Sequence, residues 1–247
     1  MTEFFPLGEV ATLAVIAFAG ALIFGLTGFG SALITIPLAT QFMPLKFTLA
    51  LFALADLACA LSVGLENPKN AVRSEWKRLV PMILAGTALG VTLLVNLPRR
   101  AGMLMLGAFV LCYGLYSLLR RYGGKPISIR WAWLAGLAGG ITSAVFGAGG
   151  PPYVIYLSQR GLTKEQFRAT LGLTTSTSIS LRVIAFLITG LLLDPRVWIA
   201  AAAVVPAALA GIFVARKLYL KISREMLLRA IALMLLASGG SLIARAV

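Results

Sequence analysis

The sequence contains no histidine, which excludes histidine-based catalytic triads, imidazole metal ligands and histidine proton relays. Asp and Glu are also rare, with eight in 247 residues, and neither a pair of catalytic carboxylates nor an activated nucleophile stands out. The two cysteines, Cys59 and Cys112, both lie in apolar runs, where cysteine usually serves as a small packing residue. From these absences we expect a protein that is not an enzyme and that holds neither a metal nor a cofactor.

Charge is scarce and apolar sequence is abundant. Charged residues make up 12% of the chain, about half the share of a soluble domain, whereas 60% of the residues are hydrophobic. Eight apolar runs are long enough, at about 20 residues, to cross a bilayer. They lie near 10–40, 47–65, 79–97, 101–119, 131–159, 169–193, 197–215 and 226–244. The sequence therefore predicts an all-α polytopic membrane protein, and its acidic rather than basic start predicts no cleaved signal peptide.

The net charge of +14 is compatible with nucleic-acid binding, but the basic residues lie in short loops between apolar segments. Such a distribution is typical of membrane proteins, whose basic loops contact anionic lipid headgroups. We therefore expect membrane lipids, and no nucleic acid, as partners. Lys69, Arg73 and Lys77 form a basic stripe for such lipids, and Glu66, Glu75, Glu165 and Glu225 are expected to be solvated beside basic residues.

The chain repeats itself. A shift of 119 residues superimposes three glycines of the first half, Gly20, Gly28 and Gly30, on Gly139, Gly147 and Gly149. Each half then consists of one glycine-interrupted segment followed by three ordinary ones. We expect two homologous transmembrane repeats, residues 1–122 and 123–247, an organisation that is common in secondary transporters.

The basic loops test how the interrupted segments run. If all eight segments span, Lys and Arg divide as 10 and 11 between the two faces, with Arg182 inside the membrane. If segment five instead enters and returns, the loops 66–78, 120–130, 160–168 and 216–229 share one face with 16 of them, against five opposite. The positive-inside rule then predicts that these loops are cytoplasmic, in a plasma-membrane protein. If segment one is also a re-entrant hairpin, which the charges do not test, the halves are inverted repeats.

The two interruptions read "GLTGFGSALITIPL" at 25–38 and "AVFGAGGPPYVIYL" at 144–157. Glycine permits positive φ, and proline favours the first turn of a helix, so each stretch predicts a break followed by a new half-helix. In the second stretch this half-helix is expected to start near Pro151 or Pro152. The free N–H groups of such a half-helix favour an anion, and the alternative is that the glycines only allow close helix packing.

Two charges lie in the middle of apolar segments, Asp56 in segment two and Arg182 in segment six. Because a charge at the bilayer centre is expensive, such residues usually face a cavity or a partner. Thr175, Ser178 and Arg182 share one helix face, where hydroxyls beside a guanidinium suit a multi-oxygen anion. Three interpretations stay open: an ion pair that only joins the halves, substrate binding by Arg182 with Asp56 as the coupling proton site, and unrelated roles.

The two glycine-rich motifs and the two four-segment halves resemble the TauE/SafE family of membrane permeases over nearly the whole chain. The motif positions are Gly28, Gly30, Ser31, Gly147, Gly149, Gly150, Pro151 and Pro152. The chain departs from the family pattern at Ser31, where a third glycine is common, and at Tyr156, which stands opposite Pro37. The resemblance implies transport of sulfite, sulfonates, sulfoacetate or related sulfur-containing anions, coupled to an ion gradient.

The sequence thus predicts a secondary transporter of small anions that works by alternating access. A non-transporting membrane assembly subunit and an anion channel are the alternatives. The exact anion, the direction of transport, the coupling proton or cation and the formation of an oligomer stay open.

Overall fold

A computed structural model describes residues 7–64, 66, 68–119, 127–218 and 240, and all regular elements in these ranges are helices. They are α1 (Leu7–Thr27), α2 (Ser31–Ala39), α3 (Leu45–Gly64), the 3-10 turn η1 (Pro68–Asn70), α4 (Arg73–Asn96), α5 (Arg99–Leu119), α6 (Trp131–Phe146), α7 (Gly150–Leu157), α8 (Lys164–Ile188) and α9 (Pro195–Leu218). Among the described residues, α1, α3, α4, α8 and α9 are long and apolar enough to cross a membrane. The prediction of an all-helical polytopic membrane protein is confirmed at this level.

Both predicted interruptions are breaks between helices. Residues 28–30 separate α1 from α2, and residues 147–149 separate α6 from α7, which starts at Gly150 with prolines in its first turn. Gly28, Gly30 and Gly147 have φ values of 82°, 94° and 73°, a region that residues with a side chain rarely adopt. The glycines therefore allow the chain to reverse at these points.

In each hairpin the short helix packs back along the long one. A Cβ atom at Gly20 of α1 would collide with Thr35 of α2, and one at Gly139 of α6 would collide with the ring of Tyr153 of α7. These two glycines are the first pair that the sequence repeat superimposes, and each provides the space in which the returning helix lies.

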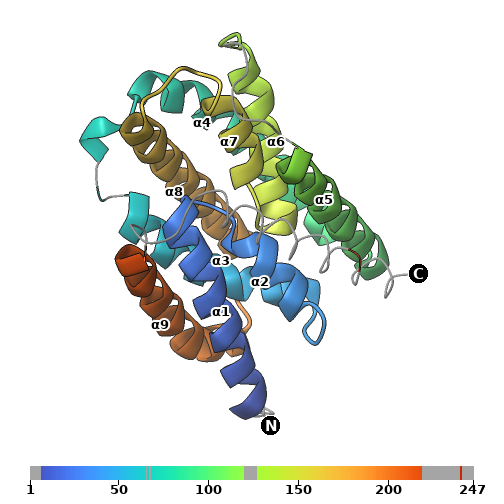
Figure 1. Ribbon diagram of the computed structural model, residues 1–247. Coiled ribbons are helices and arrows are strands. Elements are labelled where there is room, and N and C mark those ends of the chain that lie inside the picture. Colours follow the sequence, from blue (N-terminus) through green and yellow to red (C-terminus); the bar gives the residue numbers. More distant parts are fainter. Residues whose placement is uncertain (1–6, 65, 67, 120–126, 219–239, 241–247) are drawn as a thin grey trace.

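The helix contacts of the two halves are reciprocal. The most extensive contacts are α4 with α6 and α1 with α9, and α3 and α8 meet between these pairs (Figure 1). Gly86 of α4 lies against the backbone of residues 137–141 of α6, and Gly211 of α9 lies against residues 18–22 of α1. Residues 18–22 and 137–141 superimpose under the 119-residue shift. Both glycines end the same pattern, Pro-x-x-Leu-Ala-Gly, at 81–86 and 206–211.

At the centre, α3 and α8 run antiparallel. Gly64, at the end of α3, lies against Gly172 near the start of α8, and Ser176 one turn later donates a hydrogen bond of 2.8 Å to the carbonyl of Ala60. The same crossing brings Asp56 and Arg182, in the middle of their helices, into contact.

Several of the predicted basic loops meet at one end of the bundle. Arg160 donates to the carbonyl of Ile127 at 2.7 Å, and Glu66 accepts from Arg216 at 2.9 Å and lies 3.9 Å from Arg168. The part of the chain outside the described residues includes segment eight except residue 240, the boundary between residues 122 and 123, and parts of the loops 120–130 and 216–229.

Candidate functional site

The two breaks face one partly open cavity. Residues of α1, α2, α3, α6, α7, α8 and both breaks line it. They are Phe24, Phe29, Gly30, Ser31, Ala32, Asp56, Ser143, Gly147, Ala148, Gly149, Gly150, Tyr153, Thr175, Ser178 and Ile179.

The structure brings most of the predicted site residues together here. Those that line the cavity are Gly30, Ser31, Asp56, Gly147, Gly149, Gly150, Thr175 and Ser178. Gly28, Pro151 and Arg182 do not line it. Arg182 nevertheless lies directly behind the cavity wall, because a Cβ atom at Gly147 would come within 3.0 Å of its Nη1.

Asp56 is the centre of the polar contacts at the cavity. Its Oδ2 accepts from Nη2 of Arg182 at 2.8 Å, and its Oδ1 accepts from the hydroxyl of Ser31 at 2.5 Å. Asp56 and Arg182 are 3% and 1% exposed, so the pair is almost completely shielded from water. The ion pair that the sequence suggested as one interpretation is therefore present. Ser31, the first residue of α2, is bonded to its carboxylate.

Arg182 retains unused hydrogen-bonding capacity. Its Nη1 donates a long bond of 3.3 Å to the carbonyl of Ser143, and its Nε has no hydrogen-bond partner in the described part of the chain. An unpaired buried N–H group destabilises the folded state, since it has lost its water without replacement. The Nε–H group is thus able to donate to a further acceptor oxygen without the loss of an existing contact.

The two hydroxyls predicted on α8 differ in what they can donate. The Thr175 hydroxyl donates back to the carbonyl of Leu171 in its own helix at 2.9 Å, as hydroxyls in helices often do. Ser178 instead accepts a hydrogen bond of 2.9 Å from the hydroxyl of Tyr153. The Ser178 proton therefore remains available to an acceptor in the cavity.

The two half-helices are also unequal, although the repeat suggested equal ends. In α7, the second and third residues are Pro151 and Pro152, which have no N–H, so little is left for an anion to bind. In α2, Ser31 and the next two residues all retain their N–H groups, as the helix N-terminus requires for anion binding. The donor-rich end is therefore that of α2, where the Asp56 carboxylate already lies.

Three aromatic residues of the cavity wall carry no signal in the sequence. Phe24 and Phe29 come from the first half and Tyr153 from the second. Phe29 packs so closely on Gly150 that a Cβ atom there would lie 2.6 Å away. Aromatic residues in apolar helices are usually core residues, so only the tertiary structure identifies these as cavity residues.

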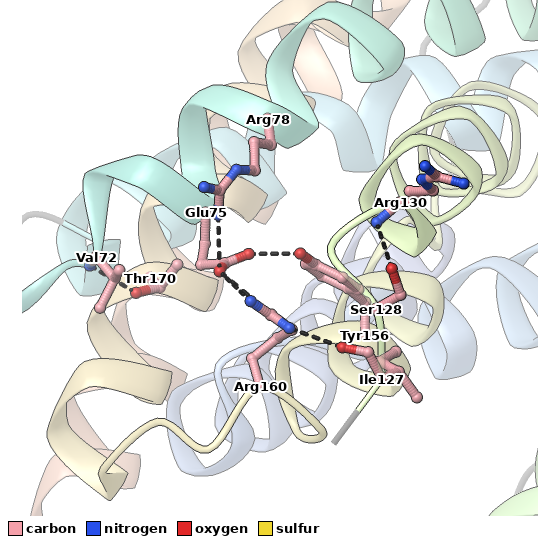
Figure 2. Close-up of polar contacts among 9 residues, drawn as sticks. All are labelled: Val72, Glu75, Arg78, Ile127, Ser128, Arg130, Tyr156, Arg160 and Thr170. Carbon is pink, nitrogen blue, oxygen red and sulfur yellow. Dashed lines mark hydrogen bonds and ion pairs between the residues drawn. The ribbon is translucent and has the colours of Figure 1, made fainter. Parts of the chain in front are cut away.

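The expectation that Glu75 is solvated is wrong. The sequence places it among basic loop residues, yet it is only 5% exposed and lies in the first turn of α4. Its carboxylate accepts hydrogen bonds from Arg78, Tyr156 and Arg160 (Figure 2). The bond to Glu75 raises the pKa of the Arg160 guanidinium, which therefore stays charged. The expectation failed because its partners on α7 and beyond are distant in sequence.

Comparisons with known proteins agree with the resemblance noted above. The family model described as "Sulfite exporter TauE/SafE" matches residues 12–242. A protein of Cupriavidus necator, named "Probable sulfite/organosulfonate exporter TauE", is 27% identical over 209 residues, which cover 80% of this chain and 75% of that protein. No solved structure matches significantly.

Proposed function

Because the chain belongs to the sulfite exporter TauE/SafE family of membrane permeases, we propose that it is a secondary transporter of small sulfur-containing anions. The observation that carries this proposal is a set of anion-binding groups at one cavity: the Ser31 hydroxyl and the N-terminus of α2 at its wall, and the Arg182 guanidinium directly behind that wall. A sulfite or a sulfonate suits these donors, since each presents several acceptor oxygens. The name of the relative supports both substrates.

In this arrangement Asp56 acts as an internal substitute for the substrate. Its two oxygens occupy the donors of Ser31 and Arg182, and an ionised carboxylate beside the cavity repels a second anion. Protonation of Asp56 removes this competition and frees the guanidinium and hydroxyl. Arg182 and Cys59 are the other titratable groups that face Asp56. Anion binding is then coupled to proton uptake, with Asp56 as the coupling residue.

The two halves, residues 1–122 and 123–247, are in this proposal inverted repeats with re-entrant first segments. The equivalent helices α3 and α8 cross in antiparallel directions. This supports inverted repeats, since a twofold axis that relates two antiparallel helices is perpendicular to their direction. The reciprocal contacts of Gly86 and Gly211 support the same axis. Alternating access then consists of a rearrangement of both halves around the cavity.

The cell membrane is the expected location, with the basic loops 66–78, 120–130, 160–168 and 216–229 on the cytoplasmic side. In this orientation a basic stripe lies next to anionic lipid headgroups. Its residues, Lys69, Arg73 and Lys77, are all exposed, as contact with lipid requires.

The first experiment measures thermal stability of the detergent-purified protein with sulfite, sulfate, thiosulfate, sulfoacetate and taurine, and with acetate as the carboxylate control. A bound anion raises stability by about 2.7 kcal/mol at 100 times its Kd. We expect stabilisation by a sulfur oxyanion, because its oxygens take the donors of Arg182 and Ser31. Arg182→Gln abolishes the effect, whereas Asp56→Asn, which removes the competing carboxylate, retains it.

Other outcomes separate the alternatives. Absence of stabilisation by every sulfur anion across the pH range contradicts the proposal and favours a non-transporting assembly subunit. Steady ionic current through planar bilayers, in place of saturable flux into liposomes, favours an anion channel.

A further inference from the structure

The Glu75 cluster, made of Glu75, Arg78, Tyr156 and Arg160, plays no part in the anion site. Tyr156 donates to Oε2 of Glu75 at 2.5 Å, and Arg160 donates to Oε1 through Nε at 3.2 Å and Nη2 at 3.0 Å (Figure 2). Arg78 of the same helix adds a bond of 3.0 Å. One buried carboxylate thus accepts four hydrogen bonds, two of which come from Arg160, three residues after the end of α7.

The cluster connects α4 to the end of α7, and the other end of α7 forms the cavity. Gly150 and Tyr153 line the cavity, and Tyr156 lies one turn later on the same short helix. Arg160 also donates to the carbonyl of Ile127, so the cluster joins three segments at one end of the bundle. Because α7 has only eight residues, a shift at its end moves its cavity residues with it.

The equivalent positions of the other half carry different residue types. The residues equivalent to Tyr156 and Arg160 are Pro37 and Gln41, and Ala200 stands at the position of Glu75 when the two Pro-x-x-Leu-Ala-Gly patterns are superimposed. None of these provides a carboxylate or a guanidinium. Instead, Ile36 and Ala39 of α2 belong to the apolar core. A buried carboxylate therefore holds the C-terminal end of α7, whereas its counterpart α2 is bonded to Asp56 at its N-terminal end through Ser31 and packs in the apolar core beyond it.

From this asymmetry we propose that Glu75 is a positioning residue for transport. It holds α7 against α4 and so keeps the cavity closed toward the end of the bundle where the loops 66–72 and 158–163 lie. Release of Tyr156 and Arg160 lets α7 move and opens the cavity to that end. This inference rests on the proposed alternating access. It implies that different contacts close the cavity toward the two ends of the bundle.

The test measures access to the cavity from each side of the membrane. Ile179→Cys, which lines the cavity without a polar contact, serves as the reporter in a Cys59→Ala, Cys112→Ala background. Its reaction with a membrane-impermeant maleimide is followed in vesicles of both orientations. Glu75→Gln and Arg160→Gln are expected to raise the labelling rate about tenfold from one face only, because they shift the population toward the open state.

Two control variants separate positioning from general loss of structure. Arg78→Gln removes a contact of the same carboxylate that does not reach α7, and Glu66→Gln breaks the separate ion pairs to Arg168 and Arg216 at the same end. Both are expected to leave labelling unchanged. Unchanged labelling in Glu75→Gln and Arg160→Gln, or an increase from both faces or in all variants, overturns the inference. If labelling responds as expected but no sulfur anion stabilises the protein, the proposed substrate is wrong and the positioning role stands.

Discussion

At the scale of single residues, the Asp56–Arg182 pair places two opposite charges in the interior of the protein. Both groups are withdrawn from water, and their attraction offsets the loss of hydration only while both are present. Such a pair contributes little net stability in general. In the proposed transport mechanism it instead serves anion exchange, in which the substrate replaces the Asp56 carboxylate at Arg182 and Ser31.

The stability of the pair can be measured by removing one partner at a time. Arg182→Gln is expected to reduce the free energy of unfolding by about 3–5 kcal/mol, because the Asp56 carboxylate stays buried without its cation. The double variant Asp56→Asn, Arg182→Gln is expected to regain most of this loss, since it buries no unpaired charge. Thermal unfolding in detergent without added anion checks both values. A double variant as unstable as the single one would contradict this account.

The two hydroxyls of α8 make a matched pair for testing the binding geometry. Ser178→Ala is expected to weaken anion binding about tenfold, as a hydrogen bond to a charged group is lost. Thr175→Val, one turn earlier at the same cavity, is expected to leave affinity almost unchanged, because the Thr175 hydroxyl is already committed to Leu171. Titration of each variant with the stabilising anion gives the two dissociation constants. Equal losses would show that the Thr175 hydroxyl turns toward the substrate.

At the scale of elements, the broken helices could be predicted because their causes are local. Glycines at positive φ and prolines in a first turn leave a clear pattern in the sequence. Asp56 and Arg182 were recognised because a charge in an apolar helix is costly. Glu75 was missed because its partners Tyr156 and Arg160 are 81 and 85 residues away, and its own neighbours in sequence are basic. The tertiary structure brings Tyr156 and Arg160 to Glu75, which is buried there.

The break before α7 provides a further prediction with an internal control. Gly147 and Gly161 have similar φ values, 73° and 67°, but a Cβ atom at Gly147 would lie 3.0 Å from Arg182 and Ala32, whereas nothing lies within 4 Å at Gly161. Both alanine variants bear the backbone strain of about 1–2 kcal/mol. Only Gly147→Ala is expected to abolish anion-dependent stabilisation, because it displaces the guanidinium. The same thermal-shift assay compares them, and loss of binding in both would point to strain alone.

At the scale of the whole molecule, the repeat explains which helices meet. Helix α1 of the first half packs on α9 of the second half at Gly211, and α6 of the second half packs on α4 of the first half at Gly86. The halves are therefore interlocked, and neither contains the complete cavity, because α2 and α3 supply Ser31 and Asp56 while α8 supplies Ser178. The shift of 119 residues revealed the repeat, but the exchange of partners could not be read from it, since contacts between halves leave no periodic pattern.

The orientation of this interlocked bundle gives the last prediction. Single cysteines at Lys69→Cys, after α3, and Ser158→Cys, after α7, are expected to react with an impermeant maleimide from the cytoplasmic face, and Leu193→Cys, after α8, from the opposite face. In the proposed topology α6 and α7 form a re-entrant hairpin, and the contact of Gly64 with Gly172 places the start of α8 beside the end of α3, close to where α4 begins. Labelling of inside-out and right-side-out vesicles in the Cys59→Ala, Cys112→Ala background checks this. If Ser158→Cys reacts from the face opposite to Lys69→Cys, segment five spans the membrane and the halves are not inverted.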